Sequence, residues 1–277
     1  AASDVYKRQT YYNAKTMNQT FNPQLPVSGW SAMYIQTGAV RNQGIELSLG
    51  YKNTWNKFSW DTGFTFSMNR NKILTLASDA INPITGENFS IGTLNMGGLG
   101  EARFLLKEGG SMGDLYSFID LKRDTNNKIY IDQAGKMTTE TIKDPKKYIK
   151  LGSVLPKGNL AWRNNFIWKN FTAGFLISAR LGGVVYSRTQ AMLDYYGVSE
   201  ASADARDLGY VLVNGRDKVN PETWYGVVGS GTSVPQYYTY SATNVRLQEV
   251  SLGYTIPRKL LNCLLYTSPS PRDVEES

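Results

Sequence analysis

FSWDTGFTFSM, residues 58–68, alternates between two contrasting classes of side chain along its whole length. Successive side chains of a strand point to opposite faces, so alternate residues share a face. One face carries Phe58, Trp60, Thr62, Phe64, Phe66 and Met68, and the other carries Ser59, Asp61, Gly63, Thr65 and Ser67. The segments IELSLGY at 45–51 and FTAGFLISARL at 171–181 show the same alternation. An aromatic and aliphatic face opposite a small polar face is typical of a transmembrane β-barrel with lipid outside and a wet lumen inside.

Alternation and turn residues predict eight strands, which are joined by connections of alternating length. The strands lie near 10–20, 36–51, 57–70, 100–107, 113–122, 157–168, 171–182 and 243–256. The short connections are 52–56, 108–112 and 169–170, and the long ones are 21–35, 71–99, 123–156 and 183–242. Outer-membrane barrels have short periplasmic turns and long extracellular loops. We therefore expect an all-β fold that forms about eight strands of an antiparallel transmembrane barrel.

Aromatic residues cluster beside the short connections. Tyr51 and Trp55 flank one expected turn, and Trp168 and Phe171 flank another. Tyrosine and tryptophan favour the membrane interface, where the ring contacts lipid and the polar atom contacts water. The alternative is ordinary strand propensity, because aromatic residues are enriched in any strand. We favour an aromatic girdle at the periplasmic edge.

Two local irregularities are predicted within this pattern. Val245 and Leu247 share one parity, whereas the apolar residues from Val250 onward follow the other. One extra residue near 248–249 realigns them, which predicts a β-bulge. The segment RTQAMLDYYG at 188–197 has no glycine or proline before its last residue, so a short helix is expected within the longest loop.

Both ends of the chain are expected to be foreign to the protein. AASDVYKRQ at 1–9 resembles the translation of a transposase-type sequencing adapter, and CLLYTSPSPRD at 263–273 resembles the matching adapter. VEES at 274–277 is then read-through. We therefore expect residues 1–9 and 263–277 to be adapter-derived and residues 10–262 to be an internal portion of a barrel domain.

Composition excludes most catalytic chemistry. The chain has no histidine, and its only cysteine, Cys263, lies in the expected adapter. Zinc sites, Ser-His triads and thiol catalysis therefore lack their usual residues, so we expect no enzyme and no cofactor. The net charge of +7 comes from lysine and arginine scattered over turns and loops, which does not favour nucleic-acid binding. No apolar run approaches the length of a membrane helix.

The segment DTNNKIYID at 124–132 is oxygen-rich, as some cation-binding loops are. An EF-type loop needs a turn glycine and a bidentate acid at its twelfth position, and both are missing. Lys128 also occupies a position where a ligand is needed. We therefore expect a solvated hairpin and no metal site.

Several motifs resemble the SusC/RagA family of TonB-dependent outer-membrane transporters. They are NQGIELSLGY at 42–51, LGSVLPKGNLAWRNNFIWKNFTAGFLISARLGG at 151–183, YYGVSEASADARDLGYVLVNG at 195–215 and NVRLQEVSLGYTIPRKLL at 244–261. The resemblance implies a 22-stranded barrel with an N-terminal plug, of which this chain holds a late portion. It also implies location in the outer membrane of a Gram-negative bacterium.

The same resemblance implies a function and a set of partners. Family members import nutrients, usually glycans or peptides, across the outer membrane. A SusD-like surface lipoprotein closes over the extracellular mouth, and TonB pulls on the plug. This chain lacks the plug and the TonB box, so we expect it to be incapable of transport alone.

The candidate site residues lie in the longest loop and on the lumen parity of two strands. The loop residues are Tyr195, Tyr196, Trp224, Tyr225, Tyr237, Tyr238 and Tyr240. Each of them either contacts substrate or lid, or packs the loop against itself, and packing is favoured for any single one. Arg163 and Arg180 have lumen parity, where they either steer an anionic or polar substrate or pair with a plug carboxylate, and we favour the plug carboxylate.

Three other classes of protein remain open at this point. A siderophore-type TonB-dependent receptor has the same architecture and a different ligand. A passive porin or adhesin barrel has no plug. A soluble carbohydrate-binding β domain requires that the apolar strand faces pack together into one core.

Overall fold

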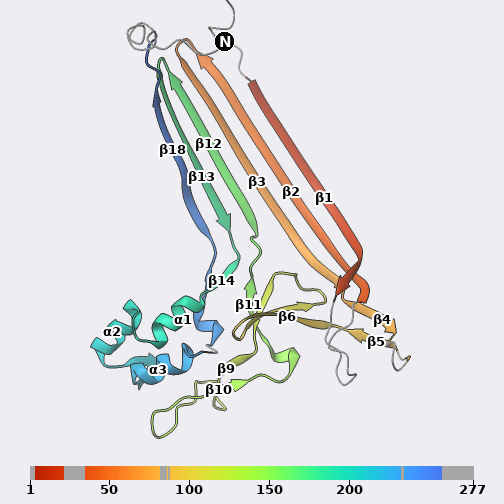
Figure 1. The fold of residues 1–277 in the computed structure, drawn as a ribbon, viewed down its shortest axis with the longest axis vertical. Coiled ribbons are helices and arrows are strands. Elements are labelled where there is room, and N and C mark those ends of the chain that lie inside the picture. The colour runs from red at the N-terminus through yellow and green to blue at the C-terminus, as the bar shows by residue number, and fades with distance from the viewer. Residues whose placement is uncertain (1–3, 22–34, 82–85, 87, 232–233, 258–277) are drawn as a thin grey trace, which may run out of the picture.

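The protein is described by a computed structural model that covers residues 4–21, 35–81, 86, 88–231 and 234–257. Its main feature is a tall antiparallel sheet of six strands in the order β1-β2-β3-β12-β13-β18 (Figure 1). These strands are β1 (Asp4–Phe21), β2 (Ile35–Trp55), β3 (Phe58–Thr75), β12 (Gly158–Trp168), β13 (Phe171–Leu181) and β18 (Asn244–Tyr254). The expected all-β barrel portion is confirmed. Among the described residues, no helix is long and apolar enough to cross a membrane.

The six strands are joined by tight turns at one end and by long insertions at the other (Figure 1). Trp55 lies opposite Phe58, and Trp168 lies opposite Phe171, so each tight turn has only two residues between the paired strands. Asn56 and Lys169 take positive φ angles of 53° in these turns. Residues 52–55, expected in a turn, therefore continue β2.

The first insertion joins β3 to β12 and carries short strands. These are β4 (Ala77–Ile81), β5 (Asn88–Ile91), β6 (Thr93–Leu99), β7 (Ala102–Lys107), β8 (Asp114–Ser117), β9 (Ile119–Leu121), β10 (Thr139–Thr141) and β11 (Ile149–Ser153), with the 3-10 helix η1 (Pro145–Lys147). β6, β7, β8 and β11 form a separate four-stranded sheet. The segments 100–107 and 113–122 do form strands, but they lie in this insertion and not in the barrel wall. The turn at 108–112 is accordingly at the insertion end and not at the tight-turn end.

The second insertion joins β13 to β18 and contains the α-helices described for this chain. Its elements are β14 (Val184–Tyr186), α1 (Arg188–Tyr195), α2 (Glu200–Leu208), β15 (Val211–Val213), β16 (Asp217–Val219), α3 (Pro221–Val228), η2 (Pro235–Tyr238) and β17 (Thr239–Ser241). The helix expected at 188–197 is confirmed as α1. α2 and α3 were not expected, and we call this second insertion, residues 182–243, the helical loop.

The register places the apolar side chains of neighbouring strands on the same face of the tall sheet. Phe64 lies between Leu49 of β2 and Trp162 of β12, and Phe175 lies opposite Val250 of β18. The register shifts by one residue between Leu176 and Ile177, which confirms the bulge near 248–249. Because of this shift, both halves of β18 present apolar side chains to the same face. We call this face the apolar face and the opposite one the polar face.

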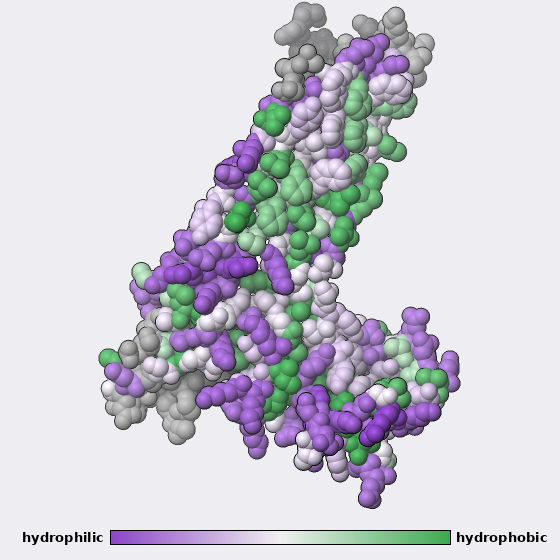
Figure 2. Space-filling model, turned by 180° about the vertical axis from the view of Figure 1, so that it is seen from behind, coloured by the Kyte–Doolittle hydropathy of each residue, from purple (hydrophilic) through white to green (hydrophobic). Residues whose placement is uncertain are grey.

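The apolar face has no core packed against it in the described part of the chain. Leu252 is 84% exposed, Val245 is 70% exposed and Trp168 is 54% exposed. Figure 2 shows hydrophobic side chains gathered over the tall sheet, with hydrophilic side chains over the insertions. A soluble domain would bury such a surface, because large exposed apolar patches favour association with other apolar matter. The soluble β-domain alternative is therefore not supported.

Aromatic rings contact one another in two groups on the apolar face near the tight turns, one across β2, β3, β12 and β13 and one across β12, β13 and β18. Trp55 and Phe58 stack with ring centroids 6.0 Å apart, and Phe171 and Tyr254 are 4.7 Å apart. Among these rings, Asn164 Oδ1 accepts a hydrogen bond from Trp60 Nε1 at 3.0 Å, whereas Asn164 Nδ2 is buried with no hydrogen-bond partner among the described residues. Aromatic residues of β2, β3, β12, β13 and β18 thus cluster at the edge where the girdle is expected, and their place at a membrane interface stays a prediction.

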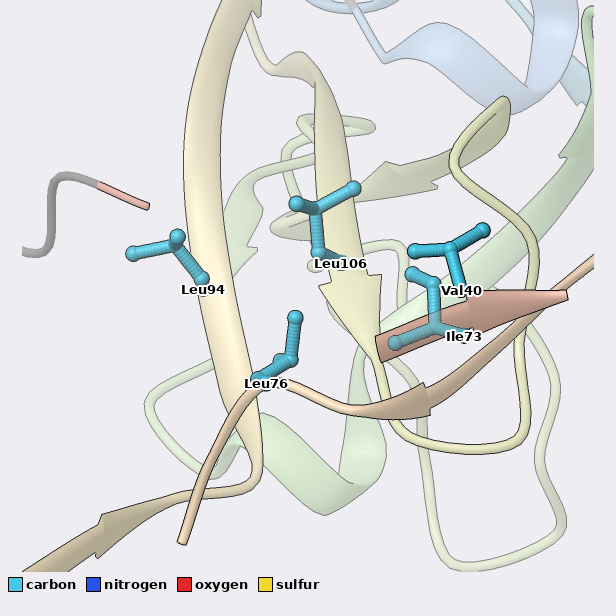
Figure 3. Packing of buried hydrophobic residues seen from close by; sticks show 5 residues of the cluster. All are labelled: Val40, Ile73, Leu76, Leu94 and Leu106. Atoms are coloured by element: carbon cyan, nitrogen blue, oxygen red, sulfur yellow. The ribbon is translucent and has the colours of Figure 1, made fainter. Parts of the chain in front are cut away.

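A compact apolar cluster ties the first insertion to the tall sheet. Figure 3 shows its five members, Val40, Ile73, Leu76, Leu94 and Leu106, which are all at most 8% exposed. The turn between β7 and β8 is also hydrogen-bonded to β3, since Ile73 N donates to Gly110 O at 2.8 Å and Gly109 N donates to Ile73 O at 2.9 Å. The insertion is thus attached to β3 by both packing and backbone hydrogen bonds.

The origin of the two chain ends remains a prediction. Asp4–Gln9, expected to be adapter-derived, continue β1 and pair with residues 47–52 of β2. Backbone pairing of this kind is available to many sequences and does not identify a source. The expected second adapter, residues 263–277, lies outside the described residues.

The face assignment predicts an asymmetry between two neighbouring substitutions. In the full-length protein, Phe64→Arg should hinder assembly into the membrane, because a charge on the lipid face near midplane costs ~2–4 kcal/mol. Thr65→Arg, on the polar face, should have a much smaller effect. The folded fraction in isolated outer membranes, measured by heat-modifiable gel mobility, tests this. Equal losses in both variants would contradict the assignment.

Candidate functional site

The helical loop has its own apolar core. Leu121, Ala191, Val228, Val234 and Tyr238 are each at most 2% exposed and pack together. Leu121 comes from β9 of the first insertion, so the two insertions share this core. The core fixes α1 and α3 relative to one another and leaves their outer faces free for other roles.

Local capping residues explain where the helices begin and end. The side chain of Ser187 accepts a hydrogen bond from Gln190 N at 3.2 Å at the start of α1. Ser199 does the same for Ser202 N at 3.1 Å in α2, which ends at Gly209 with φ 82°. Asn220 caps α3 through Glu222 N at 2.8 Å, and Pro221 occupies the first turn. These residue types are the usual caps of short helices.

A hollow of about 600 Å³ lies between the three helices. Its lining includes Asp194, Tyr195, Tyr196, Arg206, Glu222 and Tyr225. The rings of Tyr195 and Tyr196 meet edge to face, with centroids 5.1 Å apart. Three tyrosines beside charged groups of both signs suit a polar ligand with apolar surfaces, because rings stack and hydroxyl and charged groups form hydrogen bonds.

Tyr225 is held in position at the wall of this hollow. Its hydroxyl donates a hydrogen bond to Ala201 O at 3.1 Å, which links α3 to α2. Burial raises the pKa of Tyr225 above its ordinary value, and the carboxylates of Asp194 and Asp204 raise it further. The hydroxyl therefore keeps its proton at neutral pH and acts as a hydrogen-bond donor.

The other four aromatic candidates have different surroundings. Tyr238 is 2% exposed and belongs to the loop core, where burial and then Asp194 raise its pKa. Trp224 and Tyr237 pack against that core with their rings 5.2 Å apart. Tyr240 is 44% exposed on β17. The structure thus brings Tyr195, Tyr196 and Tyr225 together around the hollow and uses Trp224, Tyr237 and Tyr238 for packing, while Tyr225 also packs against the loop core.

Arg163 and Arg180 both lie on the polar face, as their parity predicts. Arg163 Nη2 forms an ion pair with Asp61 Oδ1 at 3.1 Å across β12 and β3. Arg180 Nη2 donates to Val154 O, and its Nε is buried without a partner in the described residues. The expected plug contact of either residue stays a prediction. Arg163 is already paired within the sheet, whereas Arg180 has unused donor capacity.

Sequence reasoning missed Arg246, which lies near Arg180. The two residues line one hollow of about 570 Å³ at the insertion end, together with Ser178 and Asn244. The sequence neighbours of Arg246, Val245 and Leu247, point to the apolar face. Because side chains alternate along a strand, this alternation predicts that Arg246 points to the polar face. A second hollow of about 410 Å³ on this face is lined by Glu46, Ser48, Thr65, Ser67 and Asn159, among others.

The segment 124–132 forms the hairpin that its sequence predicts. Asp124 Oδ1 accepts from Asn126 N at 2.8 Å and from Lys128 N at 2.9 Å, and Asp132 makes equivalent bonds to the next turn. The carboxylates thus stabilise turns. Across the described ranges, no group of three or more histidine, cysteine, aspartate or glutamate residues is placed to hold a metal ion.

Known proteins resemble this chain in sequence over most of its length. No family model matches it. TonB-dependent receptor P3 of Formosa agariphila is 25% identical over 280 residues, covering 91% of this chain and 25% of that protein. TonB-dependent receptor SusC of Bacteroides thetaiotaomicron is 24% identical over 258 residues, covering 88% of this chain and 23% of SusC. The chain therefore spans about a quarter of the length of these curated relatives.

Solved structures agree with the fold. The RagAB peptide transporter superimposes with a TM-score of 0.62 at 17% identity, covering 95% of this chain and 28% of that chain. The RagAB peptide importer in its closed-closed state gives a TM-score of 0.60 over 93% of this chain, again at 17% identity, and 28% of that chain. At this level of identity the likeness concerns the fold.

The two-faced sheet, its tight turns and its long insertions are features of an outer-membrane-type β-barrel wall, and over most of its length the chain is similar in sequence to TonB-dependent receptors. Within this class, the similarity to SusC and the fold of the RagAB structures confirm the resemblance to the SusC/RagA family that the motifs at 42–51 and 244–261 carry.

The division of the aromatic residues into packing and hollow-lining groups predicts different effects on stability. In the full-length protein, Trp224→Ala should destabilise the helical loop by roughly 2–4 kcal/mol, because it removes a half-buried indole from the loop core. Tyr196→Ala should change stability by less than about 0.5 kcal/mol, because that side chain is 68% exposed.

Hydrogen exchange of residues 188–228, measured by mass spectrometry, distinguishes these outcomes. Exchange should accelerate in Trp224→Ala and stay unchanged in Tyr196→Ala. Equal protection in both variants would show that Trp224 does not stabilise the loop.

Proposed function

We propose that this chain is the late barrel portion of a transporter that imports a nutrient, a glycan or a peptide, across the outer membrane of a Gram-negative bacterium in a TonB-dependent manner. The observation that supports it most is the similarity to TonB-dependent receptors over 91% and 88% of the chain. The relatives named above are receptors and transporters, so we propose no enzymatic activity and no cofactor.

In this proposal, the apolar face contacts outer-membrane lipid and the polar face lines the lumen. The exposed leucine, valine and aromatic side chains of the apolar face suit lipid. The polar face carries Arg163, Arg180 and Arg246 together with small polar residues, which suit a wet channel. The tight turns then face the periplasm, and both insertions are extracellular.

The proposed partners follow from the same placement. A surface lipoprotein of the SusD or RagB type covers the extracellular mouth, in line with the RagAB neighbours. TonB acts through a region outside this chain. The hollow lined by Tyr195, Tyr196 and Tyr225 is our proposed contact site for substrate or lid, and Tyr238 supports it from the core.

The experiment uses the full-length protein and its lipoprotein in the native outer membrane. Uptake of fluorescent oligopeptide and oligosaccharide libraries is compared in the parent strain, in a strain lacking the transporter and in a strain lacking TonB. Uptake of one library should require both proteins. Transporter-dependent uptake that persists without TonB would indicate a passive barrel and contradict the proposal.

The contact site is tested in the same assay with a matched pair of variants. Tyr195→Ala combined with Tyr196→Ala should lower uptake roughly five- to thirtyfold, equivalent to one or two kcal/mol of lost binding. Tyr130→Ala is the control, because Tyr130 is an exposed tyrosine of the first insertion (43%) and lies outside the hollow. An equal effect of both variants would show that Tyr195 and Tyr196 do not contact the ligand.

A further inference from the structure

Positively charged side chains lie opposite one another on neighbouring strands, at the end of the apolar face that is nearest the insertions. Lys15 of β1 lies directly opposite Arg41 of β2, and Arg41 lies directly opposite Lys72 of β3. Arg70 lies two residues before Lys72 on the same parity, opposite Gln43. We call Lys15, Arg41, Arg70 and Lys72 the cationic row. All four side chains share the parity of Ile45 and Met68, so they point to the lipid side of the sheet.

The cationic row is not neutralised within the described chain. None of its members forms an ion pair or a side-chain hydrogen bond among the described residues, and Arg41 Nε is buried with no hydrogen-bond partner. Like charges directly opposite one another on paired strands are destabilising. A bound anion would relieve this repulsion and satisfy the donors of Arg41.

A groove of about 680 Å³ adjoins the row where β3 continues past the start of β12. It is lined by Arg41, Arg70 and Lys72, and also by Lys150 and Lys157 from the first insertion. The carboxylate that lines it, Asp114, already pairs with Lys150 at 2.6 Å. The groove therefore carries a clear excess of positive charge and has the size of a polar head group.

The height of the row along the strands places it at the lipid head groups. Phe58 and Met68 bound the apolar stretch of β3 and are ten residues apart, about 33 Å along the strand. At the usual strand tilt this length spans an apolar band about 25 Å tall. Lys72 lies four residues farther toward the insertions. The row thus lies just beyond the band, on the side that our proposed orientation makes extracellular.

We infer that the cationic row and its groove bind the phosphate groups of a phosphorylated glycolipid in the outer leaflet of the membrane. Arginine binds phosphate through two parallel N–H bonds, and lysine adds point charge. A lipid is favoured over a soluble anion because the row faces outward, directly above the apolar band that contacts acyl chains. This inference goes beyond import and rests on the proposed function for the outer-membrane location and for the orientation of the sheet.

The test uses the purified full-length transporter in a neutral detergent, with lipid A as the probe, and binding is measured by native mass spectrometry. Arg41→Gln combined with Lys72→Gln should weaken lipid A binding at least about tenfold. Lys143→Gln combined with Lys147→Gln is the control, because it removes the same charge from exposed sites of the first insertion outside the groove. The control should bind as the parent protein does.

Two further ligands separate the possible sources of phosphate. Dephosphorylated lipid A should bind at least about tenfold more weakly than lipid A, and inorganic pyrophosphate at the same concentration should not displace lipid A. Equal binding of lipid A by both double variants, or of lipid A with and without phosphate, would overturn the inference. Displacement by pyrophosphate would show a site for soluble anions and would also overturn it.

Heat-modifiable gel mobility of each variant confirms that the barrel is folded. The outcome is independent of the uptake assay, because binding is measured without transport. A transporter that imports normally but does not bind lipid A would leave the proposed function intact and refute this inference alone.

Discussion

Cross-strand register is the constraint on which the rest of the structure depends. Phe64 lies between Leu49 and Trp162 because three strands pair without a slip, and the same register keeps small polar residues together on the other face. A shift of one residue would move every side chain of the strand to the opposite face of the sheet. The bulge in β18 shows how strictly this holds, since the extra residue there restores the apolar parity of Val250, Leu252 and Tyr254.

The two insertions are attached to the tall sheet in different ways. The first grows out of β3 and is attached to it through the cluster around Ile73 and through the backbone of Gly109 and Gly110. The helical loop connects β13 to β18 and packs around a separate core, to which the first insertion contributes Leu121. The residues that line the hollow therefore lie on the outside of a core that was assembled from distant parts of the chain. This separation lets the surface of the hollow vary without disturbing the wall.

The long strands were predictable because their alternation is uninterrupted and both faces have distinct chemistry. The same signal misplaced the segments 100–107 and 113–122, because the strands of a small separate sheet resemble barrel strands in sequence. Which sheet a strand joins depends on long-range pairing, and alternation does not contain that information. α2 and α3 were missed although Ser199, Gly209 and the pair Asn220-Pro221 mark their ends, because serine and aspartate in α2 and glycine and valine in α3 are weak helix formers.

The candidate site was predictable only as a region. Tyr238 and Tyr195 have the same chemistry and lie in the same loop, yet one is in the core and the other borders the hollow. The difference arises from contacts with Leu121, more than a hundred residues earlier in the chain, and local sequence does not reveal such contacts. Parity was more informative on the strands, where it placed Arg163 and Arg180 correctly on the polar face and would also have placed Arg246.

The attachment of the first insertion to β3 has a mechanical consequence. Val40 and Ile73 belong to adjacent wall strands, while Leu94 and Leu106 belong to the insertion, and all are packed in one dry cluster (Figure 3). A force on this insertion is therefore transmitted directly to the rim of the wall, and the insertion cannot swing without breaking that packing. The helical loop has no such anchor to β2 or β3 among the described residues. It is instead joined to the first insertion, through the core that contains Leu121 and through the hydrogen bond that Gln236 Nε2 donates to Ile119 O at 2.8 Å, so a force on either insertion reaches the same rim.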